Sequence, residues 1–228
     1  MRSSLSADDK AALSKQKLDE MLSYERALWA DGVLYVGGVD EVGRGPLAGP
    51  VCAACVVLPQ DFSIVGINDS KKLSEKKRNE FYGVITEHAF AYGIGLVGNE
   101  RIDEVNILNA TKEAMLVAVA DAQAMLAARM PSDLADDGEA AIGHLLVDAV
   151  KLSEAGIPGT AITKGDEKSV SIAAASIIAK VTRDRIMTEL DSIYPGYGFV
   201  SNKGYGTKAH YVGLRAQGPT PIHRRTFL

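Results

Sequence analysis

Two adjacent acidic residues, Asp40 and Glu41, follow a short apolar run and could hold metal ions. The run before them, 33–36, and the run after the next turn, 51–58, are short and rich in β-branched residues, which predicts two buried strands. Acidic side chains at the end of a buried strand are unfavourable unless a cation or a basic side chain compensates their charge. Neighbouring strand residues point to opposite faces, so the two acids can share one site only if the strand bends or ends there.

Two further aspartates could join this pair. Asp148 lies at or near the end of a predicted buried strand over 144–150, and a sheet can bring the ends of its inner strands side by side. Asp184 lies on a predicted helix over 169–193, one turn after Lys180 and at the edge of the apolar stripe.

Three or four converging carboxylates would repel one another strongly unless divalent cations bound between them. Mg²⁺ and Mn²⁺ prefer oxygen ligands, and two such ions about 4 Å apart activate a water and stabilise the leaving oxygen in phosphodiester cleavage. In a purely structural alternative, these acids cap a turn, end a strand, or pair with Lys180 or Arg183. Spacing alone does not decide between the two.

Arg44 stands between Gly43 and Gly45, in a turn that suits contact with a phosphate. Glycines let backbone N–H groups approach a ligand closely, and a guanidinium adds a strong donor. The turn is not a dinucleotide-binding loop, because its glycine spacing misses G-x-G-x-x-G by one residue and it leads into a strand. Lys71 and Lys164 add basic loop positions that could contact a substrate, although a loop lysine is more often simply solvated.

The C-terminal stretch 196–228 is basic on an otherwise acidic chain. It holds five Lys or Arg residues and no Asp or Glu, so the remainder carries a net charge of −9 against −4 for the whole chain. Aromatic residues, among them Tyr205 and Tyr211, interleave with Lys203 and Lys208, a mix that can stack on nucleotides and hold their phosphates. The alternatives are a solvated surface without a partner and aromatics that attach the stretch to the domain.

One mixed α/β domain is expected to hold these residues. Three early strands, the third over 89–97, favour an antiparallel meander, with Ser74 capping a helix between the second and third. Asn106 or Asn109 is expected to cap a long helix, which a loop over 131–138 follows.

The two ends of the chain have simpler patterns. A polar tail is predicted over 1–12, followed by apolar residues at helical spacing that end near Gly32. One short helix is predicted over 207–217.

The composition, with 46% hydrophobic and 24% charged residues, is typical of a soluble globular protein. No apolar run approaches the roughly 20 residues that span a bilayer, and the polar N-terminus has no signal-peptide core. Cys52 and Cys55 lie on opposite faces of one apolar strand, which favours packing roles in a reducing compartment. We therefore expect a cytoplasmic protein without a membrane partner.

Residues 38–51, Gly-Val-Asp-Glu-Val-Gly-Arg-Gly-Pro-Leu-Ala-Gly-Pro-Val, resemble the signature of bacterial ribonuclease HII, in the type 2 ribonuclease H family. The resemblance covers roughly residues 22–228, and a combination of motifs this long and ordered is very specific. The other matching segments are Glu-Arg at 25–26, Asp-Ser-Lys-Lys-Leu at 69–73, Leu-Val-Asp at 146–148, Lys-Gly-Asp at 164–166, the segment 171–184, Lys-Gly-Tyr-Gly-Thr at 203–207 and His-Arg-Arg-Thr-Phe at 223–227.

The resemblance implies a ribonuclease H-like α/β fold, a mixed five-stranded sheet flanked by helices with a helical C-terminal extension. It implies endonucleolytic cleavage of RNA in RNA–DNA hybrids, 5′ to a ribonucleotide, including a single one embedded in duplex DNA. The cut leaves 3′-hydroxyl and 5′-phosphate ends. The expected parts are a polar tail over 1–17, a catalytic domain over 18–193 and a basic, aromatic substrate-binding extension over 194–228.

The resemblance also implies Mn²⁺ or Mg²⁺ as cofactor, with two ions when substrate is bound, and a monomer. The 2′-hydroxyl distinguishes RNA from DNA at a site, so backbone donors from a tight glycine loop suit its recognition. By the resemblance, Asp40, Glu41 and Asp148 bind the metal ions, and Asp184 matches the family's fourth acid. Gly43, Arg44 and Gly45 match the loop that recognises the 2′-hydroxyl, and Tyr205 matches the tyrosine that stacks on the following deoxyribose.

Two positions depart from the family pattern. Ala149 stands where glycine is common, which changes the turn after Asp148, and Asn202 stands where histidine often precedes Lys-Gly-Tyr. Two other interpretations are another ribonuclease H-like nuclease, such as a junction resolvase that cleaves branched DNA, and a hybrid-binding module without catalysis. The second would fit better if one of the three predicted ligands were an amide.

Overall fold

The structure, a computed structural model, describes residues 7–62, 66–67, 70, 73–129 and 140–228. Its strands are β1 (Val36–Val42), β2 (Val51–Val57), β3 (Ala91–Val97), β4 (His144–Asp148) and β5 (Gly159–Ile162). Its α-helices are α1 (Ala7–Met21), α2 (Ser23–Ala30), α3 (Glu75–His88), α4 (Asn99–Arg129), α5 (Val170–Ile193), α6 (Phe199–Asn202) and α7 (Lys208–Gln217), and short 3-10 helices are η3 (Ser153–Ala155), η4 (Gly165–Glu167) and η5 (Arg225–Phe227).

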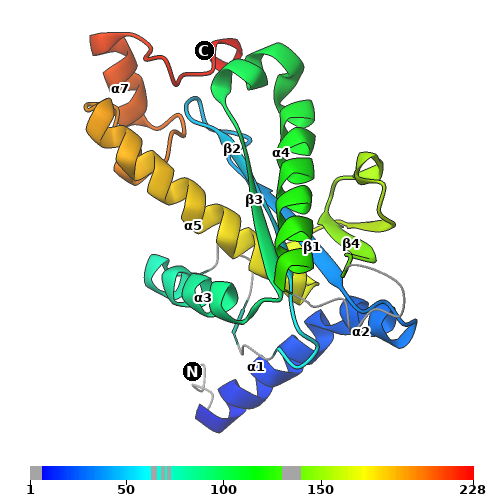
Figure 1. The fold of residues 1–228 in the computed structure, drawn as a ribbon. Coiled ribbons are helices and arrows are strands. Elements are labelled where there is room, and N and C mark those ends of the chain that lie inside the picture. The colour runs from blue at the N-terminus through cyan, green and yellow to red at the C-terminus, as the bar shows by residue number, and fades with distance from the viewer. Residues whose placement is uncertain (1–6, 63–65, 68–69, 71–72, 130–139) are drawn as a thin grey trace.

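The strands form one mixed sheet in the order β3-β2-β1-β4-β5 (Figure 1). β1 pairs antiparallel with β2, and β2 pairs antiparallel with β3. β1, β4 and β5 run parallel to one another. Helix α4 packs on one face of the sheet and α5 on the other, so the predicted mixed five-stranded sheet flanked by helices is confirmed.

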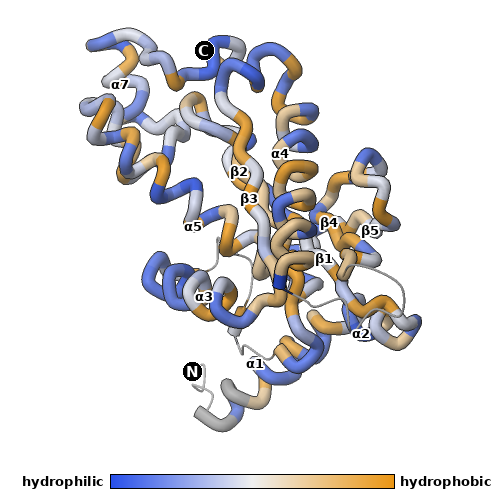
Figure 2. Tube along the Cα trace, in the orientation of Figure 1, coloured by the Kyte–Doolittle hydropathy of each residue, from blue (hydrophilic) through white to orange (hydrophobic). Residues whose placement is uncertain are grey.

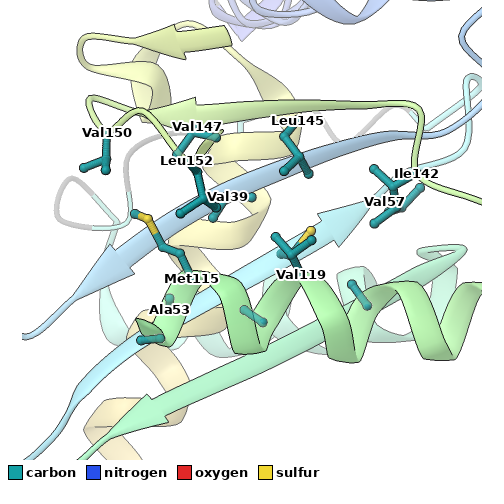
Figure 3. Packing of buried hydrophobic residues seen from close by; sticks show 14 of the residues in the cluster. Val39, Ala53, Val57, Met115, Val119, Ile142, Leu145, Val147, Val150 and Leu152 are labelled. Carbon is teal, nitrogen blue, oxygen red and sulfur yellow. The ribbon is translucent and has the colours of Figure 1, made fainter. Parts of the chain in front are cut away.

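Glycines in β3 let α4 approach the sheet closely. A Cβ added to Gly95 would lie 1.9 Å from the carbonyl oxygen of Ala114, and one added to Gly93 would lie 2.2 Å from that of Ala118. The larger hydrophobic core fills this face. Figure 3 labels, among its members, Val39, Ala53, Val57, Met115, Val119, Ile142, Leu145, Val147, Val150 and Leu152.

On the other face, α5 crosses β1 at a single glycine. A Cβ on Gly38 would lie 2.1 Å from the backbone carbon of Ser171, so only glycine fits there. The start of α5 is held by the buried Glu25 of α2, which accepts hydrogen bonds from Ser169 Oγ (2.6 Å) and Ser171 N–H (2.9 Å). A carboxylate at a helix N-terminus is favourable, which gives the motif at 25–26 a structural role.

The first strand differs from the prediction. β1 begins at Val36, where the predicted run over 33–36 ends, and continues through Gly37 and Gly38 to include both acids. Glycine is normally unfavourable in a strand, but at Gly38 the close approach of α5 requires it.

The antiparallel meander and the two caps are confirmed. Ser74 begins α3 by accepting a hydrogen bond from Lys77 N–H. Helix α4 is kinked at Asn106, with φ 66° and ψ 166°, and Asn106 Oδ1 accepts from the N–H groups of Leu108 (3.0 Å) and Asn109 (3.1 Å). Leu108, the second residue after the kink, is 47% exposed.

The predicted helices over 169–193 and 207–217 are confirmed as α5 and α7. The residue pattern predicts neither β5 nor the start of α1. Only Ile162 is buried in β5, so the strand shows no apolar alternation. Residues 7–12, expected in a tail, are helical, and their three alanines without Gly or Pro favour that conformation. Figure 2 shows hydrophobic residues along the inner strands and hydrophilic residues over much of α3.

The aromatic residues of the C-terminal extension divide into two groups. Tyr197 and Phe199 are buried and stacked, with ring centroids 5.4 Å apart, and they pack with Ala48 and Met187. Tyr205 is 43% exposed. The first group attaches the extension to the sheet domain, and Tyr205 is available to a ligand.

Three predictions fall on parts of the chain outside the described residues: the loop over 131–138, Lys71, and the beginning of the tail at 1–6. Within the described ranges, none of the helices combines the length and the apolar character needed to cross a membrane.

Candidate active site

Three carboxylates meet at one end of the sheet. β1 and β4 are parallel neighbours in which Val39 lies beside Val147, so the next residues, Asp40 and Asp148, emerge side by side. Ligand oxygens of these two residues and of Glu41 all lie within 4.8 Å of one another. β1 ends one residue after Glu41, so both acids lie in the last three residues of the strand.

Asp40 is the most deeply placed of the three, with 4% of its surface exposed. Burial raises the pKa of Asp40 well above its ordinary value of 3.8, and the charges of Glu41 and Asp148 raise it further. A hydrogen bond from Ser176 of α5 and one from Glu41 N–H (2.7 Å) to Asp40 Oδ1 act in the opposite direction. Ser176 is itself held by Ser70, with the two hydroxyl oxygens 2.9 Å apart in the interior.

The other two carboxylates are half-buried and oriented by separate groups. Arg44 Nη1 lies 3.6 Å from Glu41 Oε1. Gly165 N–H, at the start of η4, donates to Asp148 Oδ1 (2.7 Å). A Cβ on Gly165 would lie 2.5 Å from Ile172 Cδ1, so a larger residue there would require the Ile172 side chain to shift.

The donor set fits a hard divalent cation. All three side chains offer oxygen atoms, they are close enough to share an ion, and their mutual repulsion is relieved when one binds. Oxygen-only ligands suit Mg²⁺ and Mn²⁺, whereas thiolates and imidazoles favour softer metals. The cluster therefore supports the use of a divalent metal ion.

Asp184 is not one of the three clustered carboxylates. Its carboxylate forms an ion pair with Lys180 (Nζ to Oδ1, 2.7 Å), and each side chain is 17% exposed. Among the described acids, the three that lie within 4.8 Å of one another do not include it. Asp184 instead lines a cavity of about 320 Å³ between α3 and α5, together with Arg78 and Lys203.

The glycine loop faces Tyr205. Gly43 has φ +93°, a conformation that favours glycine, and a Cβ there would lie 2.2 Å from Arg183 Nε. A Cβ on Gly45 would lie 3.5 Å from Tyr205 Cε1, so ring and loop are in contact distance. Arg44, between the glycines, has an exposed side chain. The structure thus joins the predicted loop and the predicted tyrosine, which are far apart in sequence.

The two departures from the family pattern have defined structural effects. Ala149 adopts a left-handed conformation, φ 51°, immediately after Asp148. Asn202 is buried, donates to Tyr197 O (2.7 Å) and accepts from Gly204 N–H (2.8 Å). Asn202 therefore fixes the turn that carries Tyr205.

Two buried arginines have roles that the residue pattern does not predict. Arg183, a possible partner of Asp184 by sequence, instead donates to the carbonyl oxygens of Pro50 (2.8 Å), Lys203 (2.8 Å) and Ala48 (3.2 Å). Arg224 contacts carbonyls of the glycine loop. An arginine that binds only backbone carbonyls leaves no partner pattern in a sequence, so no signal distinguishes it from a surface cation.

Of the two basic loop residues, Lys164 is exposed and left-handed, φ 56°, at the start of η4. Lys71 lies outside the described part of the chain.

Comparisons with known proteins agree with this geometry. Residues 37–228 match the model of the family described as ribonuclease HII. The chain is 48% identical to the ribonuclease HII of Caldanaerobacter subterraneus subsp. tengcongensis over 99% of its own length and 88% of that protein. It is 53% identical to the ribonuclease HII of Bacillus anthracis over 95% of its length and 78% of that protein. The crystal structure of ribonuclease H2 from Pyrococcus horikoshii aligns with a TM-score of 0.63 and 28% identity, over 84% of this chain and 93% of that one.

Proposed function

We propose that this chain, which belongs to the ribonuclease HII family, cuts 5′ to ribonucleotides, including single ones embedded in duplex DNA. Its ribonuclease H activity is that of a metal-dependent endonuclease. The cut leaves a 3′-hydroxyl and a 5′-phosphate. One observation carries this proposal: the carboxylate cluster adjoins a glycine loop, and that loop faces an exposed tyrosine.

Asp40, Glu41 and Asp148 would hold two Mg²⁺ or Mn²⁺ ions when substrate is bound. Such ions lower the pKa of a bound water and neutralise charge on the leaving oxygen. The protein's own contribution is orientation: Gly165 N–H fixes Asp148, and Arg44 lies beside Glu41. Asp184 contributes from the edge of the site as a fourth acid.

Recognition of the ribonucleotide is assigned to the loop 43–45 and to Tyr205. Backbone N–H groups of the loop can donate to the 2′-hydroxyl, which a deoxyribonucleotide lacks. The ring of Tyr205, beside Gly45, would stack on the next deoxyribose. Lys71 and the basic extension 194–228 would hold phosphates of the duplex.

We further propose that the protein acts in the cytoplasm as a monomer. The free, buried thiols of Cys52 and Cys55 are compatible with a reducing compartment.

Cleavage of a labelled duplex with one embedded ribonucleotide, and of the all-DNA duplex of the same sequence, tests the proposal. Wild-type protein with Mg²⁺ or Mn²⁺ is expected to cut only the first, Asp40→Asn to cut neither, and the matched control Asp31→Asn, at an exposed residue after α2, to behave as wild type. Failure to cut with both metals would overturn it. Cleavage of a branched all-DNA substrate instead would indicate a junction resolvase.

A further inference from the structure

The guanidinium of Arg224 holds the glycine loop from inside the protein. Arg224 is fully buried and donates to the carbonyl oxygens of Gly43 (2.6 Å), Arg44 (2.9 Å) and Gly49 (2.8 and 3.0 Å). Hydrogen bonds from a charged donor are stronger than neutral ones. Burial lowers the pKa of Arg224 to about 9, and the charge of Arg183 adds to that effect, so the guanidinium remains charged at neutral pH.

Holding these carbonyls also sets the direction of two N–H groups. A trans peptide unit is planar, with its N–H and C=O pointing in opposite directions, and no described peptide bond is cis. The carbonyl of Gly43 shares its peptide unit with Arg44 N–H, and the carbonyl of Arg44 shares its unit with Gly45 N–H. Both carbonyls point inward to Arg224, so both N–H groups point outward.

These outward N–H groups are available to a ligand. Arg44 and Gly45 are exposed, and neither N–H donates to a backbone carbonyl of another described residue. We infer that Arg224 is a positioning residue, which aims the N–H groups of Arg44 and Gly45 at the 2′-hydroxyl of the bound ribonucleotide.

The segment that carries Arg224 is fixed from the outside by α4. Asn99 Nδ2 donates to the carbonyl oxygens of Pro221 (2.9 Å) and His223 (3.2 Å). Asp103 accepts from the N–H groups of residues 225–226 (2.8 and 3.0 Å). Helix α4 thus holds the C-terminal segment, and that segment holds the recognition loop through Arg224.

The inference rests on the proposed function, and the test separates the two. Dissociation constants are measured for a duplex with one ribonucleotide and for the all-DNA duplex of the same sequence, at one salt concentration, because salt changes both. All proteins compared carry Asp40→Asn to prevent cleavage, and the wild-type ratio is the one measured for Asp40→Asn alone. The dissociation constant for the all-DNA duplex divided by that for the ribonucleotide duplex reports recognition of the 2′-hydroxyl. This ratio is insensitive to a general loss of stability, provided that melting shows the variants folded.

Arg224→Lys, which cannot span three carbonyls, is expected to reduce this ratio on the order of tenfold, the effect of losing about one strong hydrogen bond. The matched control is Arg225→Lys, the same charge-preserving change at an exposed neighbour. A phosphate contact of Arg225 would affect both constants alike, so this variant should leave the ratio unchanged. If Arg224→Lys does not fold, Asn99→Ala at the half-buried end of α4 provides a milder test, with a smaller reduction expected.

A wild-type ratio near one would count against recognition of the ribonucleotide itself, and so against the proposed function. A large wild-type ratio that folded Arg224→Lys and Asn99→Ala both retain would overturn the positioning role while leaving the proposed function intact.

Discussion

Replacing Asp40 with asparagine should stabilise the metal-free protein while abolishing cleavage. The ligand oxygens lie within 4.8 Å of one another, and two unit charges at that largest separation repel by roughly 3.5 kcal/mol at an effective dielectric constant of about 20. Glu41 and Asp148 are half-exposed to solvent, which weakens the repulsion. We therefore expect Asp40→Asn to raise the free energy of unfolding by about 1–3 kcal/mol, or the Tm by roughly 2–10 °C for a domain of this size.

The size of this effect depends on pH. The pKa of Asp40 is raised by burial, then by Glu41 and Asp148, so the folded state binds a proton more tightly than the unfolded chain does. The stability of the wild type, relative to that of Asp40→Asn, is therefore greatest below the ordinary pKa of 3.8 and falls as the pH rises toward the folded pKa. The advantage of the asparagine should be larger at pH 8 than at pH 5.

Thermal melts in EDTA and in Mg²⁺, at pH 5 and pH 8, measure both effects. Mg²⁺ should raise the Tm of the wild type, because it binds only the folded state, and should change that of Asp40→Asn much less. Asp103→Asn is a matched control for which the change in Tm should have the opposite sign. Burial alone would raise the pKa of Asp103, but hydrogen bonds from Thr226 and from Arg225 N–H outweigh it and lower that pKa, so this variant should melt lower. A lower Tm for Asp40→Asn in EDTA at pH 8 would refute the reasoning.

Three further predictions concern stability. Gly43→Ala should lose about 2 kcal/mol or more in urea unfolding, because φ is +93° and the new Cβ would lie 2.2 Å from Arg183 Nε; no loss would show that the loop can move. Ala149→Gly should gain up to about 1 kcal/mol in the same assay, because it relieves φ 51°; a loss would contradict strain there. Burial and then the charge of His210 lower the pKa of His223. The contribution of His223 to stability should therefore be complete above its ordinary pKa of 6.5 and be lost as the pH falls below that value. Urea titrations at pH 7.5 and 5.5 should show this loss of stability, and His223→Asn should make the loss smaller.

The elements with a strong periodic pattern could be predicted from the sequence, and so could the caps at Ser74 and Asn106. The sequence could also predict that strand ends bring Asp40 and Asp148 together, because residues that end parallel neighbouring strands meet at one edge. The mostly exposed β5 could not be predicted, because too few of its residues are buried to show a period.

The sequence could not predict contacts between segments that lie far apart in the chain, nor contacts of side chains with backbone carbonyls. The placement of Tyr205 beside Gly45 depends on the turn that Asn202 fixes, and pattern alone does not reveal it. The same holds for the buried Arg183, whose partners are carbonyl oxygens that every residue carries. For Asp184, the helical position was compatible both with a place near the cluster and with an ion pair to Lys180. The structure shows the ion pair.

The position of the cut in a duplex with one embedded ribonucleotide tests the central claim most directly. With Mg²⁺ or Mn²⁺, we predict a single break in the labelled strand immediately 5′ to the ribonucleotide, with a 3′-hydroxyl that a DNA polymerase extends. A break elsewhere, a blocked 3′ end, equal cutting of the all-DNA duplex, or no cut with either metal would contradict the account.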